Sequence, residues 1–203
     1  MLEVTGPWKV SFDPRWGGPG DEVKFARLTD WSKHEAPGIS YYSGTAVYQK
    51  IVDVPSAVRK SSSTVFLDLG KVHNLAHVKL NGKDLGTVWC APWRVSVPAG
   101  LLKKKGNEIE ITVVNTWVNR LIGDEQEPDD FETEPGNQTG DRLGSYDIRV
   151  KSRGLKELPD WLINNEPRPS SGRYTFTSWF YYNKDAPLQP AGLLGPVQLM
   201  TTE

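Results

Sequence analysis

The strongest constraint on the fold is a series of short segments with β-strand character that are separated by turn signals. Residues 45–54 alternate between two faces and are stopped by Pro55, which cannot continue a sheet ladder. Asn81-Gly82 is a two-residue hairpin signal between two such segments. No long amphipathic helix separates the segments, so the pattern predicts an all-β fold, a jelly-roll β-sandwich. The predicted strands are residues 45–54, 65–69, 77–80, 85–89, 93–97 and 109–114.

The last part of the chain also carries strand patterns, whereas the region before it does not. Residues 173–182 are rich in aromatic residues and Thr, and residues 195–200 form a closing strand, so we expect the two chain ends to pair in one sandwich. Between residues 123 and 172, Glu, Asp, Pro, Gly and Asn dominate, which is typical of loop, with a short helix at 155–163 at most. The expected organisation is a single β-sandwich domain, 1–203, with 123–172 as an irregular acidic insertion.

Charge and cysteine content narrow the classes of partner. Lys and Arg number 24 against 25 Asp and Glu, a net charge of -1, so the chain has no excess of positive charge for nucleic acid or an anionic membrane. No apolar run approaches the roughly 20 residues of a membrane span, and the first residues lack the features of a secretion signal. With Cys90 alone and three histidines, we expect no disulfide, no metal site and no cofactor; structural calcium is left open.

Standard catalytic motifs are missing from the sequence. It has no P-loop, no dinucleotide-binding glycine motif, no nucleophile elbow and no zinc-protease helix motif. Glycosidases need only two carboxylates, so a small glycosidase using acids of the 124–134 loop is an alternative. We expect this loop to be solvated and without fixed partners, and therefore predict no catalytic residue. The acids concerned are Asp124, Glu125, Glu127, Asp129, Asp130, Glu132 and Glu134.

Aromatic residues are abundant, with 8 Trp, 7 Tyr and 6 Phe. Trp and Tyr can stack on the C–H face of a sugar ring, but in a β-sandwich they are more often part of the core. We assign Trp8, Trp31 and Trp89 to the core or its edge, and read Cys90 as a small buried hydrophobe. Trp93 and Trp117 lie at strand ends, where loops cluster, and can belong to either class. Adjacent tyrosines in a strand point to opposite faces, which leaves Tyr181 as a surface candidate.

Residues 115–124 combine two amides, an aromatic ring, a guanidinium and a carboxylate directly after a predicted strand. Such a set can bind a polyol through hydrogen bonds. The equal alternative is a corner between strand and loop, in which Asn115 and Asn119 satisfy backbone groups and Arg120 pairs with Asp124. The candidate residues for a sugar-facing or interdomain surface are Trp93, Trp117, Asn119, Arg120, Asp124 and Tyr181.

Two groups of motifs resemble known families. The motifs at 42–46, 67–70, 78–86, 91–93, 106–107 and 114–115 resemble the sugar-binding jelly-roll domain of family 2-type glycoside hydrolases. Asn-Arg-Leu-Ile-Gly-Asp-Glu-Gln at 119–126 begins a longer match. Together with 128–130, 167–169, 172–176 and 192–197, it resembles the C-terminal region of large bacterial α-L-rhamnosidase-type hydrolases, glycoside hydrolase family 106.

The resemblance implies a galactose-binding-like sandwich that serves as an accessory module. In that family the catalytic acids lie in a separate barrel domain, which has no counterpart here, so no catalytic residue is carried over. The implied function is a non-catalytic carbohydrate-binding or barrel-bracing module, and the alternative is a purely structural module without sugar affinity. The expected partner is a neutral glycan or the catalytic domain of the parent hydrolase, in a periplasmic or extracellular location.

Overall fold

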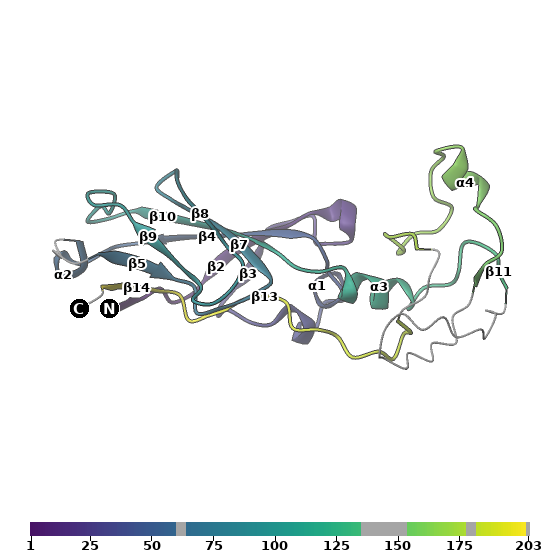
Figure 1. Ribbon diagram of the computed structural model, residues 1–203, viewed down its shortest axis with the longest axis horizontal. Helices are drawn as coiled ribbons and strands as arrows, with labels where there is room; N and C mark the ends of the chain where they lie inside the picture. Colours follow the sequence, from purple (N-terminus) through teal and green to yellow (C-terminus); the bar gives the residue numbers. More distant parts are fainter. Residues whose placement is uncertain (60–63, 135–153, 178–181, 202–203) are drawn as a thin grey trace.

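A computed structural model describes residues 1–59, 64–134, 154–177 and 182–201. Within these ranges two antiparallel sheets enclose one hydrophobic core (Figure 1). The larger sheet has the strand order β3-β2-β4-β10-β7-β8 and the smaller has the order β1-β14-β5-β9. The strands of the larger sheet are β2 (Trp8–Phe12), β3 (Val23–Phe25), β4 (Thr45–Val52), β7 (Leu75–Leu80), β8 (Lys83–Val88) and β10 (Asn107–Val114). Those of the smaller sheet are β1 (Leu2–Glu3), β5 (Val65–Asp68), β9 (Arg94–Val97) and β14 (Gln198–Thr201).

Two short strand pairs and several short helices complete the described part of the chain. The pairs are β6 (Lys71–His73) with β13 (Gly192–Gly195), and β11 (Thr133–Glu134) with β12 (Gly154–Leu155). The α-helices are α1 (Pro37–Ser40), α2 (Ser56–Arg59), α3 (Val118–Asp124) and α4 (Asp160–Ile163), and the 3-10 turns are η1 (Pro14–Trp16) and η2 (Trp31–Lys33). An all-β sandwich with short helices is therefore confirmed. No helix of the described residues has the length and apolar character to cross a membrane.

Alternating burial along the strands forms the core. In β10, Ile109, Ile111 and Val113 are buried while their neighbours are not, as a strand with one face on a core requires. The core continues into an aromatic cluster, in which the Trp31 ring is stacked on that of Tyr48. Trp8 and Trp31 are fully buried, which confirms their assignment to the core.

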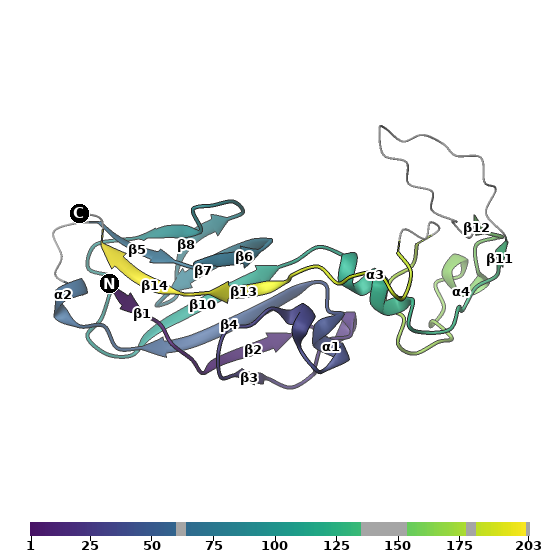
Figure 2. The same cartoon turned by 90° about the horizontal axis from the view of Figure 1, so that it is seen from below.

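The hairpin turn and the pairing of the chain ends agree with the predictions made from the sequence. Asn81 and Gly82 both have positive φ, 52° and 78°, as the tight hairpin between β7 and β8 requires. Leu2 of β1 lies opposite Leu199 of β14, so the two ends of the chain do pair in one sheet. Figure 2 shows β13 and β14 running along the sandwich towards the N-terminal strand.

Three sequence-based assignments are wrong. Trp89 is 72% exposed and Cys90 is also exposed, because β8 ends at Val88 and both residues lie in the loop before β9. Residues 173–177 form no strand; they run irregularly, held by side chains, and residues 178–181 lie outside the described part. The stretch after β10, for which the sequence leaves two alternatives open, contains the helix α3.

Between α3 and β13 the chain leaves the sandwich and returns. We call the described residues of this segment, 125–134, 154–177 and 182–191, the excursion. Figures 1 and 2 both place α4 and β11 beyond the α3 end of the sandwich. The boundaries of a single domain with an insertion at 123–172 stay a prediction.

Candidate functional site

The site begins where β10 ends and α3 starts. Asn115 accepts a hydrogen bond from Gly44 N at 2.8 Å and donates one to Tyr42 O at 2.9 Å. Asn119 donates to Gln189 O and accepts from Gln189 N, both at 2.8 Å. Both amides therefore bind backbone groups far away in the sequence, as in the second of the two readings of this stretch. Asn119 joins α3 to the end of the excursion.

Arg120 and Asp124 form a buried ion pair on one face of α3. Arg120 Nε lies 2.9 Å from Asp124 Oδ1, and the side chains are 6% and 4% exposed. The spacing of four residues brings them together on the helix. The Nε–H is not aligned on the carboxylate and makes no hydrogen bond, so the contact is an ion pair only. The Arg120 guanidinium also lies over the Tyr174 ring, 4.9 Å from its centre.

Asp124 also holds the returning chain. One carboxylate oxygen accepts a hydrogen bond from Tyr174 N at 3.1 Å, and the other accepts from Thr175 N at 2.8 Å and from Thr175 Oγ1. The carboxylate thus has an ionic partner and three hydrogen-bond donors, which is what a buried charge requires. Asp124 is a fixed point between α3 and residues 174–175.

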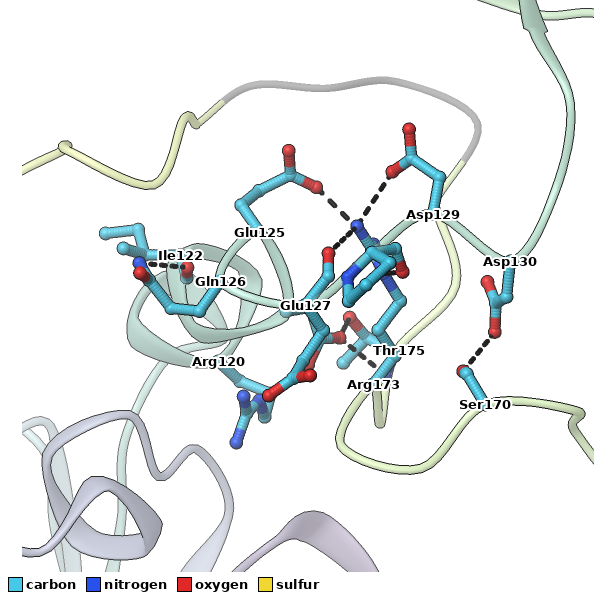
Figure 3. Close-up of polar contacts among 12 residues, drawn as sticks. Arg120, Ile122, Glu125, Gln126, Glu127, Asp129, Asp130, Ser170, Arg173 and Thr175 are labelled. Atoms are coloured by element: carbon cyan, nitrogen blue, oxygen red, sulfur yellow. Dashed lines mark hydrogen bonds and ion pairs between the residues drawn. The ribbon is translucent and has the colours of Figure 1, made fainter.

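A second arginine organises the acids that follow α3. Arg173 is buried, and its guanidinium lies 2.8 Å from Asp129 Oδ1 and 3.5 Å from Glu125 Oε1 (Figure 3). It also donates to the carbonyl oxygens of Glu127 and Pro128, at 2.9 and 2.8 Å. One cation therefore draws the chain from 125 to 129 into a tight turn.

A third arginine binds the next carboxylate. Arg168 makes a two-point contact with Asp130, with Nη2 3.0 Å from Oδ1 and Nε on Oδ2, and Ser170 Oγ also donates to Asp130. Burial alone would raise the pKa of Asp130, but these hydrogen bonds outweigh it and hold the pKa below its ordinary value near 3.8. The expectation of a solvated acidic loop without fixed partners is therefore wrong for Asp124, Asp129 and Asp130.

The remaining candidates do not join this cluster as one set. Trp117 is adjacent to it, 49% exposed, and packs edge-to-face on Trp16. Trp93 is half-buried against the core and precedes β9 in the smaller sheet. Tyr181 lies outside the described residues. Asn119, Arg120 and Asp124 are buried, so their side chains do not form an open surface in this chain.

Several residues of the site were not among the sequence candidates. Arg168, Arg173 and Thr175 lie 38 to 51 residues after their partners, and local patterns carry no signal of such pairs. Trp16 follows the Asp-Pro-Arg turn and gave no strand pattern of its own. Among the described residues, no group of three or more His, Cys, Asp or Glu side chains is arranged to hold a metal ion.

Comparison with known proteins relates the chain to carbohydrate-cleaving enzymes. No family model matches it. A protein of Formosa agariphila named "Putative beta-glucuronidase" is 41% identical over 203 residues, covering 98% of this chain and 15% of that protein. The solved structure of a rhamnosidase from Novosphingobium sp. PP1Y is 34% identical over 98% of this chain, with a TM-score of 0.71, and again 15% of its length is covered.

The chain thus spans about a seventh of each relative's length, and the two relatives are named as a putative beta-glucuronidase and a rhamnosidase. The match to the rhamnosidase extends over nearly the whole chain, the excursion included, and the similarity is found in both sequence and fold. This chain is a glycoside hydrolase-related domain.

Proposed function

We propose that the chain is a non-catalytic accessory module of a polysaccharide-degrading glycoside hydrolase of the α-L-rhamnosidase type, family 106, and that it braces the catalytic part of that enzyme. The observation that carries the proposal is the buried Arg120–Asp124 pair, from which Asp124 binds the backbone of Tyr174 and Thr175. A buried carboxylate with four partners fixes a structural joint.

The excursion has a small core of its own. This core supports the proposal that the excursion is ordered and contacts another part of the enzyme. Phe176 packs edge-to-face on both Phe131 and Trp161, with ring centres 5.6 and 5.8 Å apart. Arg168 lies over the Trp161 ring at 5.1 Å. These contacts join α4 to Phe131 before it and Phe176 after it, so α4 is held in a defined position within the excursion.

The outer side of α4 supplies a surface for a protein partner. Leu158, Leu162 and Ile163 are 51%, 38% and 62% exposed and lie within one turn and its lead-in. Clustered exposed aliphatic side chains are typical of a protein contact and offer a sugar no flat face or polar group. We infer that this surface, the α4 face, contacts the remainder of the parent hydrolase.

The acids between residues 124 and 134 support a non-catalytic role. A glycosidase needs one carboxyl that keeps its proton and a second that is free to act on the sugar. Asp124, Asp129 and Asp130 instead bind arginines, so carboxylate oxygens that would act on a sugar are already engaged within the protein. The alternative of a small glycosidase acting through these residues is therefore disfavoured.

The test replaces the matching region of the Formosa agariphila relative with this chain and follows thermal unfolding by calorimetry. We expect the unaltered chimera to melt with the module and the remainder coupled in one transition. The double variant Leu162→Glu/Ile163→Glu should separate the transitions, because charge at the α4 face removes an apolar contact. The control is Ile51→Glu, a similarly exposed position, 67%, on β4 of the sandwich.

Two results would overturn the proposal. The first is that the chimera and its Leu162→Glu/Ile163→Glu variant unfold identically, which would mean that the α4 face does not contact the rest of the enzyme. The second is release of chromophore from an aryl α-L-rhamnoside or aryl β-D-glucuronide by the isolated chain, lost in Asp130→Asn, which would make the chain an enzyme in its own right.

A further inference from the structure

An exposed group of aromatic rings lies at the joint between the sandwich and the excursion. Trp16, Trp117 and Tyr174 are 37%, 49% and 36% exposed. They come from three distant parts of the chain: the end of η1, the residue before α3 and the returning segment of the excursion. We call these three residues the aromatic patch.

Contacts between the segments place the three rings together. Trp16 and Trp117 pack edge-to-face with ring centres 5.1 Å apart and planes at 76°. Gly17 directly follows Trp16, and a Cβ built on it would lie 2.6 Å from the Tyr174 ring, so Tyr174 lies against this turn. Gly17 has φ 79°, a conformation that favours glycine, and this allows the close approach.

The patch is fixed before any ligand arrives. Trp16 ends a turn whose first residue is capped by Asp13, which accepts a hydrogen bond from Arg15 N at 3.0 Å. Tyr174 is held by its backbone bond to Asp124 and by the Arg120 guanidinium over its ring. Rings held in this way lose little conformational entropy on binding, which favours affinity for a small flat ligand.

The charges around the patch are balanced within the protein. Arg120 pairs with Asp124 behind Tyr174, and Arg15 pairs with Asp13 beside Trp16 at 2.7 Å. The Arg15 side chain is 83% exposed, and Arg15 and Asp13 together present hydrogen-bond donors and acceptors to solvent. The surface therefore combines aromatic faces with a polar edge whose two charges are paired with each other. Aromatic faces match the C–H side of a pyranose ring, and the donors and acceptors of the paired side chains match its hydroxyls.

We propose that the aromatic patch binds a pyranose unit of a neutral glycan, with Trp117 and Trp16 as the stacking rings. The patch uses none of the residues of the α4 face, so glycan binding here would not compete with the protein contact proposed for that face. A module with both properties would hold a polysaccharide chain beside the enzyme to which it is attached.

The test is affinity gel electrophoresis of the chain through gels that contain pectic galactan, arabinogalactan or polygalacturonate, with calorimetric titration of L-rhamnose and D-galactose at millimolar concentration. We expect retardation by at least one of the two neutral polysaccharides and none by polygalacturonate. Loss of one stacking ring should weaken binding about tenfold, so Trp117→Ala and Trp16→Ala should each reduce the retardation strongly. Trp89→Ala is the matched control, since Trp89 is 72% exposed in the β8–β9 loop.

The inference is overturned if neither neutral polysaccharide retards the chain and neither sugar releases heat, or if Trp89→Ala weakens binding as much as Trp117→Ala. It is also overturned if Trp117→Ala lowers the melting temperature of the chimera while the chain binds no glycan, because the patch would then be a second protein contact. Each variant's melting temperature is measured first, and binding by Trp16→Ala decides the outcome if Trp117→Ala does not fold.

Discussion

Thr175 donates two hydrogen bonds to Asp124, from its backbone N at 2.8 Å and from its hydroxyl, across 51 residues of sequence. The same carboxylate lies 2.9 Å from Arg120 Nε. Asp124 is therefore where a helix at the end of the sandwich and the returning chain of the excursion are joined. A change confined to this carboxylate tests the joint without altering the shape of the side chain.

Asp124→Asn should destabilise the excursion selectively. The variant leaves the Arg120 charge buried without its partner, a loss of about 3–5 kcal/mol for a buried pair. Hydrogen exchange should show faster exchange in residues 154–177, while the strands of the larger sheet keep their protection. Asp21→Asn, at an exposed position, is the control. Equal exchange in both variants, or uniform loss of protection over the whole chain, would contradict this role of Asp124.

The strands were predictable because their pattern is local. Residues 45–54 and 109–114 alternate with period two, and in the structure they pair directly as β4 and β10. The same signal is present in Trp8, Val10 and Phe12, which form β2, although no strand was assigned there. The pattern does not show where a strand ends. Trp89 is exposed because β8 ends one residue before it, at Val88.

The site was predictable only in part. The pairing of Arg120 with Asp124 belongs to one of the two alternatives that the sequence leaves open, and the helix α3 that carries the pair is not predicted. Arg173 and its acids are more than 40 residues apart in sequence, and nothing in either segment alone indicates the other. The site is formed by contacts between residues far apart in the sequence, whereas each strand of the sandwich can be recognised from the alternation of its own residues.

Tyr48→Phe should weaken the sandwich core. The buried Tyr48 hydroxyl accepts hydrogen bonds from Trp31 Nε1 at 2.6 Å and from Leu193 N at 3.3 Å, and burial raises the pKa of this hydroxyl, which keeps it neutral. Phenylalanine leaves both donors unpaired, at a cost of about 1–3 kcal/mol. Urea denaturation measures the loss. Tyr174→Phe, at an exposed ring, should change the free energy of unfolding by less than about 0.5 kcal/mol.

Stability should fall as the pH drops below neutrality because of His73. Burial, and secondarily the charge of Lys71, lowers the pKa of His73 below its ordinary 6.5, against an opposing effect of Asp30. Its Nε2 is buried without a hydrogen-bond partner. As the pH falls through 6.5 the unfolded chain gains a proton that the folded chain still refuses, so the free energy of unfolding decreases. Melting temperatures between pH 8 and 5 should show a shallower decline for His73→Gln, and an unchanged slope would contradict this account.

The excursion should open in acid at a pH set by Arg168. The hydrogen bonds from Arg168 and Ser170 hold the pKa of Asp130 below 3.8, so its contribution to stability is present above that pH and is lost as the pH falls through the lowered pKa. Arg168→Gln removes the largest of the effects that lower the pKa of Asp130, so the excursion should open at a higher pH than in the parent chain. Limited proteolysis with pepsin, which is active in acid, measures the pH at which residues 154–177 become cleavable. Arg15→Gln, whose parent side chain is 83% exposed on the sandwich, should leave that pH unchanged. The same cleavage pH in Arg168→Gln and the parent chain would mean that the Asp130 contact does not hold the excursion closed.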